Sequence, residues 1–200
     1  MKKLIFILVM FLSSCGIFIN PVYNKLSDEE KEFYNPDTIS EQNKNINQKG
    51  KVYPVNKNIL EGLIKNSDIK YHLVVLYAVW CSPCRKELPE ILNYFEKKNV
   101  TLYFITSDDW RYIENVKNYW NKTNYNDATY ILDIYEYKHK NSLRSGINVR
   151  NKVFLNSLCF NCSELGGYPI FILFNNDFEV IFKKAGTIEN FNITFDQIIK

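Results

Sequence analysis

Apolar and polar positions follow a regular pattern from about residue 51 onward. Residues 73–79 form an unbroken apolar run, which is typical of a central strand covered on both faces. Within about 82–97, apolar residues recur at the i, i+3, i+4, i+7 spacing of one buried helical stripe. The sequence therefore predicts a buried strand that leads directly into an amphipathic helix.

The rest of the pattern predicts more strands and helices in alternation. Ser107, Asp108 and Asp109 offer N-cap groups to a second helix, and residues 175–177 indicate a hairpin turn. We expect strands at 101–106, 130–134, 170–174 and 178–182, helices at about 109–121 and 188–200, and one helix within 138–166. Alternation followed by a hairpin predicts the α/β class, with a mixed central sheet and helices on both faces.

Composition and charge narrow the classes of function. The chain has 200 residues, 46% of them apolar, which suits one domain with appendages. Its formal charge of +3 falls to +1 without Lys2 and Lys3 (3 − 2 = 1), so no nucleic-acid surface is indicated. The glycines form no phosphate-binding loop, and His72 and His139 lack the spacing of a metal site. We therefore expect no cofactor and no resident metal.

The N-terminus has the layout of an exported protein. A basic start precedes the apolar run 4–12, which is too short for a membrane span of about 20 residues and suits a signal peptide. The following Leu12-Ser13-Ser14-Cys15-Gly16 resembles the lipobox of bacterial lipoproteins. That resemblance implies cleavage before Cys15 and a lipid anchor on it. The alternative is an ordinary secretory signal with an incidental Cys15.

These observations divide the chain into three parts. Residues 1–14 are expected to be a lipoprotein signal peptide. Residues 15–50 are expected to be a lipidated N-terminus with a flexible tether, because polar residues dominate there. A short helix is expected within 25–34. Residues 51–200 are expected to form the folded domain.

Four cysteines remain if Cys15 is lipidated, and they form two Cys-x-x-Cys pairs in a compartment where disulfides persist. The first pair, Cys81 and Cys84, lies where the buried strand ends and the helix begins. The free N–H groups and partial positive charge of a helix start favour a thiolate. The pKa of Cys81 is therefore expected to fall from about 8.5 toward roughly 3.5–7.5, which makes Cys81 the nucleophile and Cys84 the resolving thiol. Pro83 suits an early helical position.

A single pair of this spacing could instead be half a zinc site or a structural disulfide, but its strand–helix context favours redox chemistry. The stretch Ala78-Val79-Trp80-Cys81-Ser82-Pro83-Cys84-Arg85-Lys86-Glu87-Leu88-Pro89 resembles the active site of thioredoxin-like proteins. More narrowly, it is similar to the TlpA/ResA group of membrane-anchored bacterial thiol–disulfide oxidoreductases. The resemblance implies a thioredoxin-like fold over about 51–200. It also implies a helix kink at Pro89 and tuning of cysteine ionisation by Glu87.

A second match lies at Gly166-Gly167-Tyr168-Pro169, just before a predicted strand. It is similar to the loop that carries the family's cis-proline beside the active site. The resemblance implies that Pro169 positions backbone for pairing with substrate. Trp80, Ser82, Pro83 and Tyr168 would then be neighbours of the dithiol.

Some residues depart from the family pattern. Thioredoxin itself has a buried acid six residues before the nucleophile, where this chain has Val75. Proton transfer from Cys84 is therefore assigned to Glu87, which could instead be a solvated residue paired with a neighbouring cation. Tyr168 is bulkier than the small or β-branched residue that usually precedes the cis-proline, so we expect it to narrow the substrate groove.

The second pair, Cys159 and Cys162, lies in a segment longer than the family resemblance leads us to expect. Three interpretations stay open for it. It could be a structural disulfide that pins the segment, a second redox pair that relays electrons to Cys81 and Cys84, or a metal site, formed alone or together with the first pair.

The sequence thus predicts a lipoprotein thiol–disulfide oxidoreductase on the outer side of a membrane. Its expected partners are exported proteins with disulfides or dithiols, and a membrane electron donor. The family analogy favours a reductase, because Ser82-Pro83 lacks the histidine of strongly oxidising relatives. A rival hypothesis is a non-catalytic lipoprotein of the same fold that binds copper, zinc or a protein partner.

Overall fold

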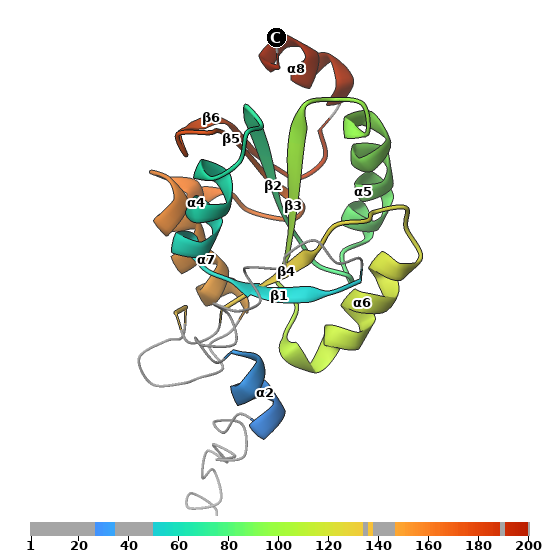
Figure 1. Cartoon of the computed structure of the whole chain (residues 1–200), viewed down its shortest axis with the longest axis vertical. Helices are drawn as coiled ribbons and strands as arrows, with labels where there is room; N and C mark the ends of the chain where they lie inside the picture. The colour runs from blue at the N-terminus through green and yellow to red at the C-terminus, as the bar shows by residue number, and fades with distance from the viewer. Residues whose placement is uncertain (1–26, 35–49, 134–135, 138–146, 189–190, 200) are drawn as a thin grey trace, which may run out of the picture.

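The computed structural model describes residues 27–34, 50–133, 136–137, 147–188 and 191–199, which build one mixed sheet with helices on both sides (Figure 1). The strands are β1 (Val52–Val55), β2 (Tyr71–Tyr77), β3 (Val100–Thr106), β4 (Thr129–Leu132), β5 (Ile170–Asn175) and β6 (Val180–Ala185). They lie in the order β1-β4-β3-β2-β5-β6. The pairs from β1 to β2 are parallel, and the last two pairs are antiparallel. The predicted α/β class, with a mixed central sheet and helices on both faces, is confirmed.

Helices cover the two faces of this sheet. The described residues form the helices α2 (Asp28–Phe33), α4 (Lys57–Lys65), α5 (Ser82–Phe95), α6 (Ile113–Asn121), α7 (Ile147–Leu158) and α8 (Phe191–Ile198), with short 3-10 turns η2 (Trp110–Tyr112) and η3 (Cys162–Glu164). Helices α5 and α6 lie on one side, and α4 and α7 on the other (Figure 1). We call these sides the α5 face and the α7 face.

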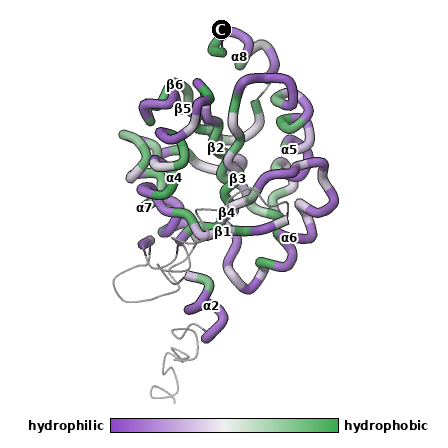
Figure 2. The backbone as a smooth tube through the Cα atoms, viewed as in Figure 1, coloured by the Kyte–Doolittle hydropathy of each residue, from purple (hydrophilic) through white to green (hydrophobic). Residues whose placement is uncertain are grey.

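The alternation of side chains along β2 explains why both faces are filled. Leu73, Val75 and Tyr77 belong to the core of the α5 face, while Val74 and Leu76 belong to that of the α7 face. All of these side chains are at most 1% exposed. A continuous apolar run is the pattern of a strand buried on both faces. The helices that cover such a strand need only one apolar side, and α5 and α6 accordingly alternate between hydrophobic and hydrophilic stretches along their length (Figure 2).

Most predicted elements are confirmed within a few residues, but β1 and α4 were not predicted. β1 has only four residues and includes Pro54, which a strand tolerates at the edge of a sheet. α4 has nine residues, with Leu60 and Ile64 buried and Asn56 as its N-cap. β1 is too short to produce a persistent period in the sequence. In α4, Ile59, Leu60, Leu63 and Ile64 recur at helical spacing, a signal that the sequence prediction missed.

The segment before the predicted domain boundary contains the expected short helix, α2. A capping box between Ser27 and Glu30 fixes its start. Its end packs on the domain: the Phe33 ring lies 4.2 Å from that of Trp110, and Tyr34 is 1% exposed. Part of the predicted tether thus contacts the domain, while the boundary itself stays a prediction.

The long segment before the hairpin holds α7, as predicted, in the crossover from β4 to β5. No helix within the described ranges is long and apolar enough to cross a membrane. The predicted signal peptide and Cys15 lie outside the described residues, so the lipid anchor stays a prediction.

Candidate active site

The Cys81–Cys84 pair lies at the predicted junction of β2 and α5. The Cys81 N–H donates to the carbonyl of Ala78 at 3.1 Å, which closes a tight turn after the strand. Cys81 is the N-cap of α5, and its Sγ accepts the N–H of Cys84 at 3.2 Å. The two cysteines form a disulfide, with Cα atoms 5.3 Å apart. The sequence spacing therefore brings both sulfurs into the first turn of a 14-residue helix.

The two sulfurs differ in access. Cys81 is 6% exposed and Cys84 is fully buried. The exposure of Cys81 is small because its N-cap position directs Sγ at the backbone of the first turn. Only Cys81 retains a surface that a partner could reach. Pro83 lies in the first turn, as predicted, and Pro89 lies inside the helix.

A buried carboxylate holds the turn that precedes the dithiol. Asp108 follows β3, and its Oδ2 accepts the N–H of Val79 at 2.8 Å and the hydroxyl of Thr106 at 2.6 Å. Its side chain is 2% exposed, and burial raises the pKa of this carboxyl. Sequence reasoning treated Asp108 only as a cap. The signal that it missed is position, because neighbouring parallel strands end at the same edge of the sheet.

The Tyr168–Pro169 bond is cis, as the family resemblance implied. Ile170, the next residue, pairs with Leu76 in the sheet, so this loop lies beside the end of β2. The ring of Tyr168 meets that of Trp80 edge to face, with centroids 5.7 Å apart and planes at 85°. The loop and the dithiol turn are therefore neighbours, as predicted.

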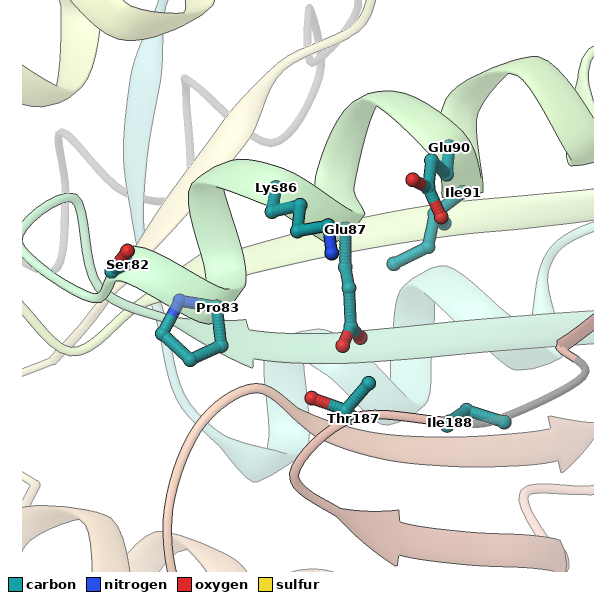
Figure 3. A pocket seen from close by; sticks show the side chains of 8 residues that line it. All are labelled: Ser82, Pro83, Lys86, Glu87, Glu90, Ile91, Thr187 and Ile188. Carbon is teal, nitrogen blue, oxygen red and sulfur yellow. The ribbon is translucent and has the colours of Figure 1, made fainter.

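Glu87 is 8% exposed, so it is not a solvated surface residue. Figure 3 shows its carboxylate directed at the loop after β6, where it hydrogen-bonds to the hydroxyl of Thr187. Burial raises the pKa of this carboxyl, and the bond from Thr187 and the charge of Lys86 oppose the rise. Its Oε1 has no hydrogen-bond partner among the described residues. The carboxylate borders a groove of about 330 Å³ that also reaches Ser82 and Pro83.

The second pair lies on the opposite side of the sheet. Cys159 follows the last turn of α7, where its N–H donates to the carbonyl of Leu155 at 3.3 Å. Cys159 and Cys162 form a disulfide with Cα atoms 5.4 Å apart. Cys162 is fully buried in the core of the α7 face, whereas Cys81 and Cys84 belong to that of the α5 face. In the described part of the chain, no three His, Cys, Asp or Glu residues gather as a metal site would need.

Comparisons with known proteins give structural neighbours only. No protein-family model and no curated protein matches the chain. A thioredoxin-related protein from Neisseria meningitidis serogroup B has a TM-score of 0.47 and 18% identity, covering 74% of this chain and 90% of that one. A thioredoxin family thiol:disulfide interchange protein from Chlorobium tepidum TLS has a TM-score of 0.45 and 18% identity, covering 70% and 81%. A thiol:disulfide interchange protein from Bacteroides sp. has a TM-score of 0.39 and 26% identity, covering 70% and 77%.

Proposed function

We propose that this chain is a lipid-anchored thiol–disulfide oxidoreductase that reduces disulfides in exported proteins through Cys81 and Cys84. One observation carries the proposal: Cys81 is the N-cap of α5, and its sulfur accepts the backbone N–H of Cys84. A free N–H and the positive end of a helix dipole stabilise a thiolate over a thiol. A structural disulfide needs no such arrangement.

The reaction proceeds in two exchanges. The Cys81 thiolate attacks one sulfur of the partner's disulfide, and the other sulfur leaves as a thiolate that takes up a proton. Cys84 then loses its proton and attacks Sγ of Cys81, which releases the partner's second thiol. The partner gains two electrons and two protons, and the protein ends with the Cys81–Cys84 disulfide. Another dithiol protein at the membrane must return the protein to its reduced form.

Glu87 is the proposed acceptor of the Cys84 proton. It lies three residues after Cys84, so both project from the same side of α5. Burial raises the pKa of its carboxyl, which brings that carboxyl closer to the pH at which an acid–base group is effective. Val75, on β2, has no titratable group. The Glu87 carboxyl is therefore proposed as the proton acceptor in place of an acid on that strand.

Pro169 is the proposed docking edge for the partner's backbone. Pro169 has no N–H to donate, and its carbonyl already accepts the N–H of Gly186 at 2.8 Å. The backbone of Tyr168, on the other side of the cis bond, is therefore the part of the loop proposed to pair with an incoming strand. The adjacent position of the loop and the end of β2 supports this role.

The anchor at Cys15 would hold the domain at the outer face of a membrane, where exported proteins fold and a membrane dithiol can reach it.

The test is the turnover and the reduction potential of the full-length protein, purified in detergent. Wild type should release thiols from an unfolded disulfide protein. Cys84→Ser should accumulate a mixed disulfide on Cys81, and Cys81→Ser should be inactive. A potential near about −270 mV supports a reductase, while a value near about −120 mV would make the protein an oxidant. Bound copper or zinc together with no thiol release would favour the binding module instead.

A further inference from the structure

An aromatic corner borders the reactive sulfur. Trp80 directly precedes Cys81 and is 57% exposed, although it is a large apolar side chain. The ring of Tyr168 stands almost perpendicular to it, at 85°. The two perpendicular rings thus present two aromatic faces at an angle to one another. An exposed aromatic side chain beside a reactive group is typical of an interaction site.

Helix α7 fixes the position of the Tyr168 side chain of this corner through a hydrogen bond. The Asn151 side-chain amide, on α7, donates a hydrogen bond to the Tyr168 hydroxyl. That hydroxyl also hydrogen-bonds to Ser107, whose own hydroxyl donates to the carbonyl of Tyr77 at 3.0 Å. Asn151 is 5% exposed. The Tyr168 ring is thus tied to α7 on one side and to the ends of β3 and β2 on the other.

Disulfide geometry brings the partner's side chains to this corner. A cysteine joined to Cys81 has its Cα within about 4.4–6.8 Å of the Cα of Cys81. Its sequence neighbours lie one residue farther, about 3.8 Å from Cα to Cα. Trp80 is itself the sequence neighbour of Cys81. A residue beside the partner's cysteine is therefore within reach of the aromatic corner during the exchange.

We infer that Trp80 and Tyr168 select partners whose cysteine is flanked by bulky apolar side chains, and that Asn151 is the positioning residue that fixes this corner. The inference rests on the proposed function, because it concerns the partner of the same exchange. A fixed corner costs less conformational entropy on binding than a mobile one. Selectivity should thus depend on the bond between Asn151 and Tyr168 and not only on the presence of the rings.

The test uses two symmetric peptide disulfides, (Gly-Phe-Cys-Phe-Gly)₂ and (Gly-Ser-Cys-Ser-Gly)₂, with the full-length reduced protein in detergent. Rates of thiol release are divided by the rate of each peptide with dithiothreitol, which corrects for intrinsic reactivity. Wild type should prefer the Phe peptide by about three- to tenfold. Asn151→Ala should reduce that preference below about twofold.

Two variants make the result specific. Tyr168→Phe keeps the ring and removes the hydroxyl, so it should lower selectivity like Asn151→Ala even if the latter folds poorly. Asn156→Ala makes the same change at an exposed position of the same helix and should leave selectivity unchanged. Equal rates with both peptides, or full selectivity in both corner variants, would overturn the inference alone. No thiol release from either peptide would overturn the proposed function as well.

Discussion

Asp108→Ala is expected to lower the free energy of unfolding by about 2–4 kcal/mol. The carboxylate accepts two hydrogen bonds, from the Val79 N–H at 2.8 Å and the Thr106 hydroxyl at 2.6 Å. Hydrogen bonds to a charged group contribute about 1.5–3 kcal/mol each, so the two together contribute about 3–6 kcal/mol. Burial of the carboxyl, which raises its pKa, offsets part of this. The remainder gives the expected loss.

Asp108→Asn separates the contribution of the negative charge from that of the hydrogen bonds. Its side-chain oxygen can still accept a hydrogen bond, but the charge is gone and an NH₂ group enters a site that is 2% exposed. Neutral hydrogen bonds contribute about 0.5–1.5 kcal/mol each, so the expected loss is about 1–2 kcal/mol. The order of stability should therefore be wild type, then Asp108→Asn, then Asp108→Ala.

Urea unfolding of the oxidised protein, followed by tryptophan fluorescence and far-UV circular dichroism, measures these values. The slope of the transition should stay unchanged, so that the midpoints report stability alone. Asp68→Ala is the matched control, since Asp68 is exposed and exposed substitutions usually change stability by less than about 0.5 kcal/mol. If Asp108→Ala behaved like Asp68→Ala, the carboxylate would not be holding the turn before the dithiol.

Three further predictions concern titration and the second disulfide. Burial raises the pKa of Glu87 above its usual 4.5, so the folded state loses stability as pH rises through the folded-state pKa. Glu87→Gln should then melt above wild type at pH 8 but not at pH 4. Burial lowers the pKa of His72 below 6.5. Stability should therefore fall as pH drops below about 6.5, and a melting series of His72→Gln should lack that fall. Replacing Cys159 and Cys162 by Ser should cost about 2 kcal/mol of stability, as expected for a very short closed loop. Thiol release should be unchanged, and a large drop in turnover would support the electron relay.

The sequence was sufficient where one strong local pattern decides the structure. The apolar run of β2 and the stripe of α5 need no knowledge of their partners, because burial of each follows from its own period. The cysteine pair could be placed at their junction for the same reason. β1 could not be predicted, since a four-residue strand that includes Pro54 is stable only through its pairing with β4.

Contacts between distant segments account for the missed part of the site. The Asp108 carboxylate meets the Val79 N–H only because β2 and β3 pair in a register that ends both strands together. Glu87 is buried because the loop after β6 returns to α5, which its position on the helix does not reveal. The bond between Asn151 and Tyr168 depends on how α7 packs against the sheet. Tertiary packing, rather than local preference, determines all three.

The two Cys-x-x-Cys pairs show why spacing alone does not define chemistry. Cys81 caps the N-terminus of α5, whereas Cys159 follows the C-terminal turn of α7. A helix dipole stabilises a thiolate at the first position and destabilises one at the second. Stabilising the reduced form makes a disulfide easier to reduce. The same motif is therefore expected to exchange electrons at Cys81 and Cys84, and to form a structural disulfide after the end of α7 at Cys159 and Cys162.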